Sequence, residues 1–126
     1  MMIYGVGIDL VENDRIEKII QKWDEKFLCR VFSDREIEYC SRHAQAHIHY
    51  GARFAVKEAF LKAIGIGLGR GVKLREIEVV NGQSGKPTLK LYGGAKDFFQ
   101  QAGIQTAYLS ITHTKKYASA LVLLEK

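Results

Sequence analysis

The residues best suited to chemistry in this chain are two acidic side chains in separate segments, Asp9 and Glu58. Asp9 ends the run Gly5-Val-Gly-Ile-Asp9, and Glu58 lies four residues before Lys62 in a segment typical of a helix. If the fold brings the two carboxylates to about 4 Å, they repel by about 4 kcal/mol at an effective dielectric constant of ~20. A hard divalent cation such as Mg²⁺ would neutralise them, and flanking lysines then suit a phosphorylated ligand. The pattern favours a magnesium-dependent enzyme that acts on a pyrophosphate.

Each half of this pair also has an ordinary structural explanation. Asp9 could simply end a strand, and Glu58 with Lys62 could be a solvated i, i+4 helix pair that contributes ~0.2–0.5 kcal/mol. The combination favours function, because the glutamate is followed by a glycine-rich loop from Gly65 to Gly71 and by a second turn containing Gly85-Lys86-Pro87. Neither loop has the spacing of a Walker A motif or a dinucleotide-binding fingerprint.

Several histidines offer further chemistry. The run Ser110-Ile-Thr-His-Thr114 places His113 beside hydroxyl groups at the end of a predicted strand, where it could bind phosphate or transfer a proton. A histidine that only packs at a hairpin end is the plain alternative. His43 and His47 have the spacing of one helix face and could contact a metal, but no third ligand is evident, so surface or interface positions are favoured.

Two elements must position the acidic pair. Tyr4, Val6, Ile8 and Leu10 alternate with Gly5, Gly7 and Asp9, which predicts a strand whose glycine face is open for a ligand. A central helix is predicted from Ala44 to Ile64. Its buried stripe has helical spacing and comprises Val56, Ala59, Phe60, Ala63 and Ile64. On the other face, Arg53 and Lys57 form an i, i+4 pair that could equally be surface charge.

The remaining pattern predicts an α+β domain over residues 1–126, with a small antiparallel sheet packed on one long central helix. Further helices are predicted over Arg15–Lys22, Glu25–Arg30, Asp34–His43 and from residue 93 or 94 to Gln101. Strands are predicted over Lys73–Val80, Thr88–Tyr92, Thr106–His113 and Tyr117–Leu124, of which the last two form a hairpin.

Composition restricts the class of protein. The chain has 126 residues with 47% hydrophobic and 26% charged residues, which is enough for one core. Neither a signal peptide nor a membrane span is evident. Cys29 and Cys40 belong to no metal-type or CxxC motif, so we expect two buried or half-buried free thiols and a cytoplasmic location.

Basic residues are concentrated in two places. The formal net charge is +5, and residues 51–76 hold six lysines and arginines against two glutamates, which favours anionic partners. A second group follows helical spacing as a basic stripe with an apolar centre, formed by Arg15, Ile19, Lys22, Lys26 and Arg30. This stripe is either a solvated face or a docking surface for an acidic helix.

Together, these segments resemble the holo-acyl-carrier-protein synthase family, the short bacterial type of 4'-phosphopantetheinyl transferase, over nearly the whole chain. Gly5–Asp9 with Arg15 resembles the first motif of that family, and Arg53–Gly65 resembles the second and most specific one. Asn81–Pro87 and Leu109–His113 resemble the third and fourth motifs. The histidine-rich run Ala44–Tyr50 is unlike the family, and the role of His43, His47 and His49 stays open.

The resemblance implies a 4'-phosphopantetheinyl transferase fold and a reaction in fatty acid biosynthesis. The 4'-phosphopantetheine group of coenzyme A is transferred to a serine hydroxyl of apo acyl carrier protein, and adenosine 3',5'-bisphosphate is released. It also implies a homotrimer with active sites at subunit interfaces. Nucleic acid and membrane are not among the partners that we expect.

Residue roles follow from the same resemblance. Asp9 and Glu58 would hold Mg²⁺, and Lys62 would neutralise charge on the phosphates, while Glu58, a metal-bound water or His113 would take the serine proton. Catalysis would thus involve Asp9, Glu58, Lys62 and His113. The expected contacts to coenzyme A are Arg53, Lys62, Gly65, Asn81, Gly85, Pro87, Thr112 and His113. Carrier docking would use Arg15, Ile19, Lys22 and Arg30.

Three alternatives remain at this point. The same chemistry could act on carrier domains of peptide or polyketide synthases. A subunit without catalytic activity could bind coenzyme A or the carrier. A small nucleic-acid-binding module is suggested by the pI of about 9.2. The last is disfavoured because aromatic residues are not interleaved with the basic ones as a stacking surface requires.

Overall fold

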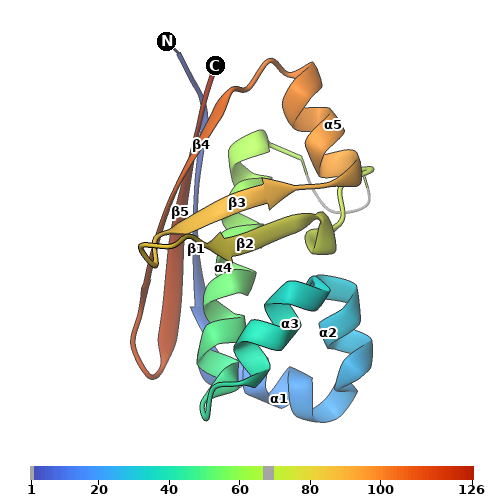
Figure 1. The fold of residues 1–126 in the computed structure, drawn as a ribbon, viewed down its shortest axis with the longest axis vertical. Coiled ribbons are helices and arrows are strands. Elements are labelled where there is room, and N and C mark those ends of the chain that lie inside the picture. The colour runs from blue at the N-terminus through green and yellow to red at the C-terminus, as the bar shows by residue number, and fades with distance from the viewer. Residues whose placement is uncertain (1, 67–69) are drawn as a thin grey trace.

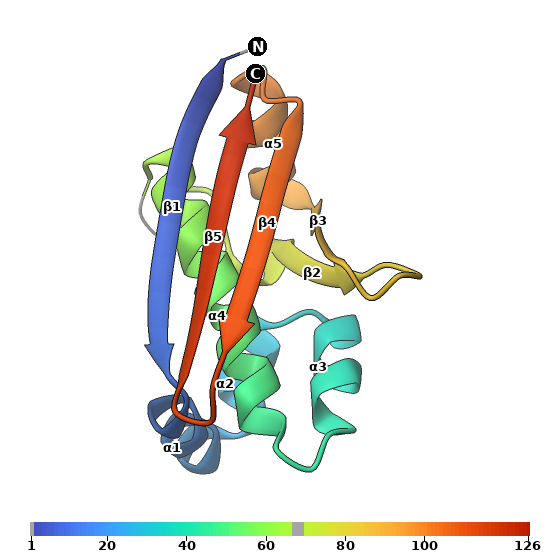
Figure 2. The ribbon, with the colours of Figure 1, turned by 90° about the vertical axis from the view of Figure 1, so that its left-hand side faces the viewer.

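A three-stranded antiparallel sheet forms one layer of the molecule (Figure 2). The computed structural model describes residues 2–66 and 70–126. Strands β1 (Ile3–Glu12), β4 (Thr106–His113) and β5 (Tyr117–Glu125) are arranged in the order β1-β5-β4. Side chains of β5 alternate between the two faces, and the inner ones are fully buried against the central helix: Ala118, Ala120, Val122 and Leu124. The α+β class with a small antiparallel sheet is therefore confirmed.

The central helix α4 (Ala46–Ile64) lies against the inner face of this sheet (Figure 1). A Cβ atom on Gly5 would lie 1.9 Å from the carbonyl oxygen of Ala63, and one on Gly7 would lie 1.8 Å from that of Ala59. Only glycine permits so close an approach of β1 to the helix. The expectation that these glycines open a face to a ligand is wrong, because α4 fills that face.

The predicted buried stripe of α4 is confirmed, since each of its five residues is at most 5% exposed. Arg53 and Lys57 are also buried, at 5% and 0% exposure, so the surface-charge interpretation of this pair is wrong. A second layer covers their side of the helix. Lys57 Nζ donates to Glu36 Oε1 at 2.8 Å and to the carbonyl oxygen of Leu74 at 3.0 Å. A buried ammonium is tolerated there because its donors are satisfied.

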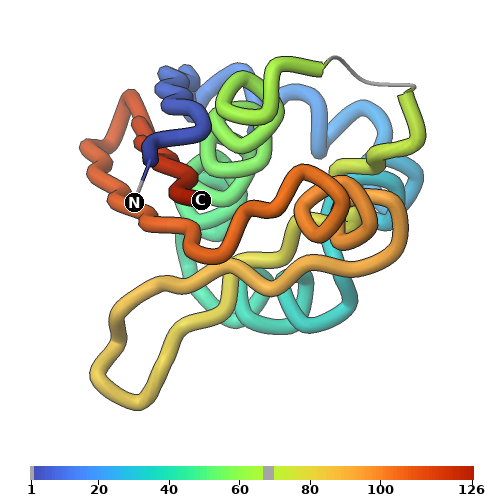
Figure 3. Tube along the Cα trace, turned by 90° about the horizontal axis from the view of Figure 1, so that it is seen from above, coloured from blue at the N-terminus to red at the C-terminus, as the bar shows by residue number. Residues whose placement is uncertain are grey.

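The second layer consists of short elements on the far side of α4 (Figure 1). Its helices are α1 (Asn13–Trp23), α2 (Glu25–Val31), α3 (Asp34–Ser41), η1 (Leu74–Glu76) and α5 (Gly93–Gln101). Its strands β2 (Ile77–Asn81) and β3 (Pro87–Leu91) form a separate antiparallel pair. Seen from above, the turn that joins them projects from the rest of the molecule (Figure 3).

Three local expectations need correction. The strand predicted from Lys73 begins instead with the 3-10 turn η1, so β2 is shorter. Helix α3 ends at Ser41, so His43 and His47 do not share one helix. Both thiols were expected to be buried or half-buried. Cys40 is buried, and burial raises the pKa of its thiol to about 12, but Cys29 is exposed.

Among the described residues, no helix is long and apolar enough to cross a membrane.

Candidate active site

The predicted acidic pair converges on one cleft beside β1 and α4. A cavity of about 300 Å³ is lined by Asp9 and Glu58 together with Arg15, Ile19 and Phe54, among others. Asp9 is two residues beyond Gly7 on the same face of β1. Gly5 and Gly7 on this face contact α4, so the carboxylate of Asp9 points toward the same helix. Helix α4 supplies Glu58 to the same cleft. Asp9 and Glu58 are 49 positions apart in the chain, and the packing of α4 against β1 brings them together.

Lys62 is the cation that pairs with Asp9. Its Nζ lies 3.0 Å from Asp9 Oδ1 and donates a second hydrogen bond, also 3.0 Å long, to the carbonyl oxygen of Ile8. Glu58 has no ion pair within 4.0 Å among the described residues, so the simple i, i+4 pair of Glu58 with Lys62 is not formed. Through these two hydrogen bonds, Lys62 links α4 to Ile8 and Asp9 of β1.

The negative charge of Glu58 is only partly compensated by positive charge in the cleft. Burial raises the pKa of the Glu58 carboxyl, the negative charge of Asp9 raises it further, and the ammonium of Lys62 opposes both. Lys62 is paired with Asp9, so the Glu58 carboxylate has no ion pair of its own among the described residues. Carboxylate oxygens are the ligands that Mg²⁺ accepts from proteins, usually one or two at a time with phosphates completing the shell. The donor set fits that ion.

The predicted docking stripe borders this cleft. Ile19 is half-buried and lines both the acidic cavity and a second cavity of about 560 Å³ along α1 and α2. Arg15, Lys22 and Arg30 are exposed. Trp23, which sequence reasoning missed, is 51% exposed in this second cavity, with Lys22 Nζ 5.2 Å from its ring centroid. An exposed tryptophan at the end of an amphipathic helix could have indicated this surface.

Two other predicted ligand-binding residues meet at a different cavity. Arg53 and Asn81 line about 300 Å³ of space together with Tyr39, Arg35 and Arg42. The guanidinium carbon of Arg53 lies 4.3 Å from the centroid of the Tyr39 ring, and its buried Nε has no hydrogen-bond partner among the residues that the structure describes. Three arginines against one glutamate, Glu38, line this cavity, which gives it an excess of positive charge suited to an anion.

The remaining predicted residues lie on exposed turns and strand ends. Gly65 ends α4 in the left-handed conformation, with φ of 78°, as the sequence predicts for a helix stop. Part of the glycine-rich loop, residues 67–69, is outside the described residues. Gly85 is in the projecting turn and Pro87 begins β3, while Thr112 and His113 are exposed at the end of β4. None of these lines the acidic cavity.

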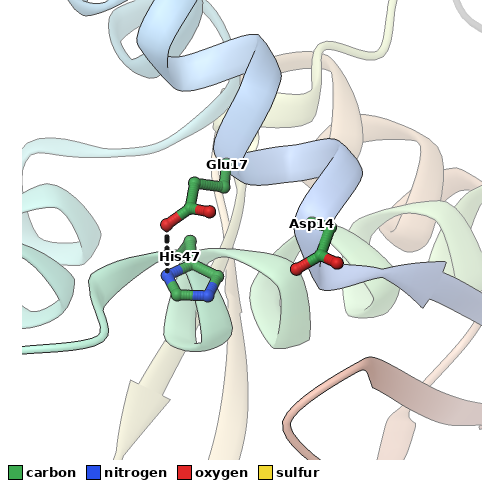
Figure 4. Close-up of side chains that lie close together, drawn as sticks. All are labelled: Asp14, Glu17 and His47. Carbon is green, nitrogen blue, oxygen red and sulfur yellow. Dashed lines mark ion pairs between the residues drawn. The ribbon is translucent and has the colours of Figure 1, made fainter.

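The structure separates the histidines whose role was open. The ring of His43 stacks on that of His49, and His49 lies near His113, so these three gather near Arg53. His47 belongs elsewhere, with its Nδ1 3.3 Å from Glu17 Oε2 and with Asp14 nearby (Figure 4). The ligand atoms of this second group all lie within 4.8 Å of one another. Both α1 and α4 begin here, and carboxylates are favourable at helix N-termini, which gives this group a structural explanation.

Residues 5–122 match the 4'-phosphopantetheinyl transferase superfamily, and this chain belongs to that family. Among curated relatives, it is 52% identical to the holo-[acyl-carrier-protein] synthase of Syntrophus aciditrophicus (strain SB), over 98% of this chain and 97% of the relative. The family resemblance found in the sequence is confirmed.

Solved structures agree with this assignment. The crystal structure of the Neisseria meningitidis holo-[acyl-carrier-protein] synthase superposes with a TM-score of 0.92 at 30% identity, covering 99% of this chain and 100% of that one. A holo-(acyl-carrier-protein) synthase from Bacillus anthracis str. Ames, solved in complex with CoA (3',5'-ADP), has a TM-score of 0.80 at 35% identity, with 98% and 97% coverage.

Proposed function

We propose that this chain transfers the 4'-phosphopantetheine group of coenzyme A to a serine hydroxyl of apo acyl carrier protein in fatty acid biosynthesis. The observation that carries the proposal is the convergence of Asp9, Glu58 and Lys62 in one cleft bordered by a basic, partly apolar surface. Membership of the family and full-length similarity to holo-[acyl-carrier-protein] synthases support it. The chain is an enzyme of this type.

The reaction forms one P–O bond and breaks another. The serine oxygen bonds to the phosphorus that carries the pantetheine arm, and the bond from that phosphorus to the bridging oxygen breaks. Adenosine 3',5'-bisphosphate leaves with the bridging oxygen, and the serine proton is released. Asp9 and Glu58 would hold Mg²⁺, which when bound acts as a Lewis acid toward the pyrophosphate. Lys62 reaches this cleft from α4 and would neutralise charge on the phosphate oxygens.

The nucleotide end of coenzyme A would occupy the cavity of about 300 Å³ beside α3 and β2. Arg53 and Asn81 line it, whereas His113 is not among its lining residues and lies with its ring centroid 6.3 Å from that of His49. Gly65, Gly85, Pro87 and Thr112 complete the proposed contacts. The acidic cleft and this cavity have no lining residue in common, although both use α4. Within one chain they are two half-sites, so a complete site would require two subunits.

Exposed apolar side chains indicate where subunits would meet. No other described element covers the outer face of the three-stranded sheet (Figure 2). Val6, Ile8 and Leu10 on β1 are 52%, 62% and 66% exposed, and Tyr108 on β4 is 52% exposed. Patches of this kind mark interaction surfaces. We infer a homotrimer from the family resemblance, and a head-to-tail interface that joins unlike half-sites gives such a ring when its rotation closes.

Intact-mass measurement of the carrier tests the reaction. Apo acyl carrier protein incubated with coenzyme A, Mg²⁺ and this chain should gain the mass of one phosphopantetheine group. The matched control is the Glu58→Gln variant, which keeps the side-chain shape and removes the charge. An unmodified carrier after incubation with the wild-type chain would contradict the proposed function.

A further inference from the structure

A mixed cluster of two carboxylates and one imidazole lies where α1 meets the first turn of α4 (Figure 4). Asp14 and Glu17 come from α1, and His47 comes from α4. One ligand atom of each residue lies within 4.8 Å of those of the other two. None of the three residues lines the acidic cleft or the cavity beside α3 and β2. The cluster is therefore separate from the proposed transfer site.

The shortest recorded contact in this cluster has the length expected for two ligands of one metal ion. His47 Nδ1 lies 3.3 Å from Glu17 Oε2. An N–H···O hydrogen bond is usually about 2.9–3.0 Å long. In a tetrahedral Zn²⁺ site with bonds of about 2.0–2.2 Å, two ligand atoms are about 3.3–3.6 Å apart. The nitrogen and the oxygen are thus already at the separation that a shared ion requires.

The two carboxylates of the cluster have no lysine or arginine partner. No such nitrogen lies within 4.0 Å of Asp14 or Glu17 in the described part of the chain. Carboxylates are favourable near helix N-termini, so the dipoles of α1 and α4 account for the acidic side chains. They do not account for an imidazole nitrogen directed at one of them. A divalent cation explains both kinds of donor, because it neutralises two carboxylates and accepts a neutral nitrogen.

The backbone segments that carry the cluster are held against each other. Asn13, at the start of α1, is fully buried, and its Nδ2 donates to the carbonyl oxygens of Thr114 and Lys115, both at 3.1 Å. A Cβ atom on Gly51, one turn after His47, would lie 2.4 Å from Asn13 Oδ1. The start of α1 therefore packs closely on the first turns of α4. Metal ligands on rigid elements are positioned before the ion arrives.

The donor set and its exposure indicate the class of ion. The side chains of Glu17 and His47 are 44% and 20% exposed, so an ion and a water molecule can reach them. Imidazole combined with carboxylates suits Zn²⁺ and its first-row neighbours, whereas Mg²⁺ prefers oxygen ligands. We propose that Asp14, Glu17 and His47 form a second metal site for a divalent cation of the Zn²⁺ class, with water in the fourth position. The bound ion would join α1 to α4.

Titration with Zn²⁺ in competition with a chromogenic chelator tests the site. With Mg²⁺ in excess, the wild-type chain should bind one equivalent of Zn²⁺. His47→Phe keeps a ring, Glu17→Ala keeps a good helix former, and each removes one ligand. Either change should weaken Zn²⁺ binding by at least about 100-fold, since loss of a group that only hydrogen-bonds to a ligand already costs about 10–100-fold. Glu17→Ala decides the question if His47→Phe does not fold.

Two matched controls locate the ion. His43→Phe removes a histidine outside the cluster, and Glu58→Gln removes a carboxylate of the acidic cleft, so both variants should keep the equivalent of Zn²⁺. Thermal unfolding gives a second readout. Zn²⁺ should raise the Tm of the wild-type chain and of both controls, because it binds the folded state. In His47→Phe and Glu17→Ala this increase should be largely lost.

The possible results separate this site from the transfer reaction. A wild-type chain that binds no Zn²⁺ in the titration would overturn the site. Binding that survives in both His47→Phe and Glu17→Ala would also overturn it. Loss of binding in His43→Phe or Glu58→Gln would do the same, because the ion would then lie elsewhere. None of these results decides whether phosphopantetheine is transferred, which is measured on the carrier.

Discussion

At the scale of single residues, the acidic cleft is defined by unequal charge. Asp9 is paired with Lys62 at 3.0 Å, whereas Glu58 is half-buried without an ion pair among the described residues. Burial raises the pKa of the Glu58 carboxyl, and the charge of Asp9 raises it further. A group in this state is easily neutralised by a proton or by a metal ion, which compete for the same oxygens.

The first prediction concerns Glu58 in the metal-free protein. Asp9→Asn removes the nearest negative charge, so the pKa of Glu58 should fall toward its ordinary value. Titration of the side-chain carboxyl by carbon-detected NMR measures it. Because burial is the larger cause and remains, part of the increase should persist. A Glu58 pKa that stays the same in Asp9→Asn would show that the two carboxylates do not interact.

The second prediction concerns turnover. Asp9→Ala and Glu58→Ala should each reduce transfer by at least two orders of magnitude, because several kcal/mol of metal-dependent stabilisation are lost and 1.36 kcal/mol corresponds to tenfold. The rate of carrier modification with Mg²⁺ supplied is the measurement, and circular dichroism checks that the fold is intact. Undiminished turnover in either variant would remove the metal assignment.

At the scale of secondary structure elements, β1 and α4 bring Asp9 and Glu58 together through contact of their backbones. Gly5 and Gly7 meet carbonyl oxygens of α4 where any side chain would collide. The short distance between β1 and α4 is thus possible only because Gly5 and Gly7 have no Cβ atom. A change there should affect both stability and the position of Asp9.

The third prediction is that Gly7→Ala destabilises the protein. Its Cβ would lie 1.8 Å from the carbonyl oxygen of Ala59, so the strand must move away from the helix. Overpacking of this kind costs about 1–3 kcal/mol or more. Urea unfolding at a fixed protein concentration measures it. The control is Gly82→Ala, where the nearest atom is 3.5 Å away, and an equal loss in both variants would contradict the packing explanation.

The fourth prediction concerns the surface formed by α1 and α2. Arg15→Glu and Lys22→Glu should raise KM for acyl carrier protein more than KM for coenzyme A, because the positive charge would receive an acidic partner. Steady-state kinetics at two salt concentrations measure this, and salt should weaken the wild-type encounter. Lys96→Glu on α5 is the control. Equal changes for both substrates would argue against docking at this surface.

At the scale of the whole molecule, one chain presents two half-sites and an uncovered sheet face. The acidic cleft borders α1, whereas the Arg53 cavity lies beside α3 and β2. The turn between β2 and β3 projects away from the rest of the molecule (Figure 3). These features are explained together if neighbouring subunits complete each site.

The fifth prediction follows from that arrangement. Asp9→Asn and Arg53→Ala each damage a different half-site, so either homooligomer should be impaired. Subunits of the two variants that are unfolded and refolded together should recover part of the activity, because some interfaces then combine two intact halves. Refolding each variant alone is the control. No recovery in a mixture shown by light scattering to form trimers would contradict sites shared between subunits.

Local sequence patterns determined much of this protein. The strand Thr106–His113 agrees with the prediction at both ends, and the buried stripe of α4 follows the predicted spacing. These elements depend on periodicity and on turn residues, which act over a few neighbouring positions. The motif segments were sufficient to indicate the family, because they hold the acidic pair and its lysine in a fixed order.

Tertiary structure alone decided the environment of each side chain. Arg53 and Lys57 looked like surface charges, and only the second layer over α4 shows them to be buried. Gly7 looked like an opening for a ligand and is instead the contact with a helix. His43 stacks on His49 and not beside His47 because α3 ends before it. Burial and contact depend on segments far apart in the chain, and no local spacing contains that information.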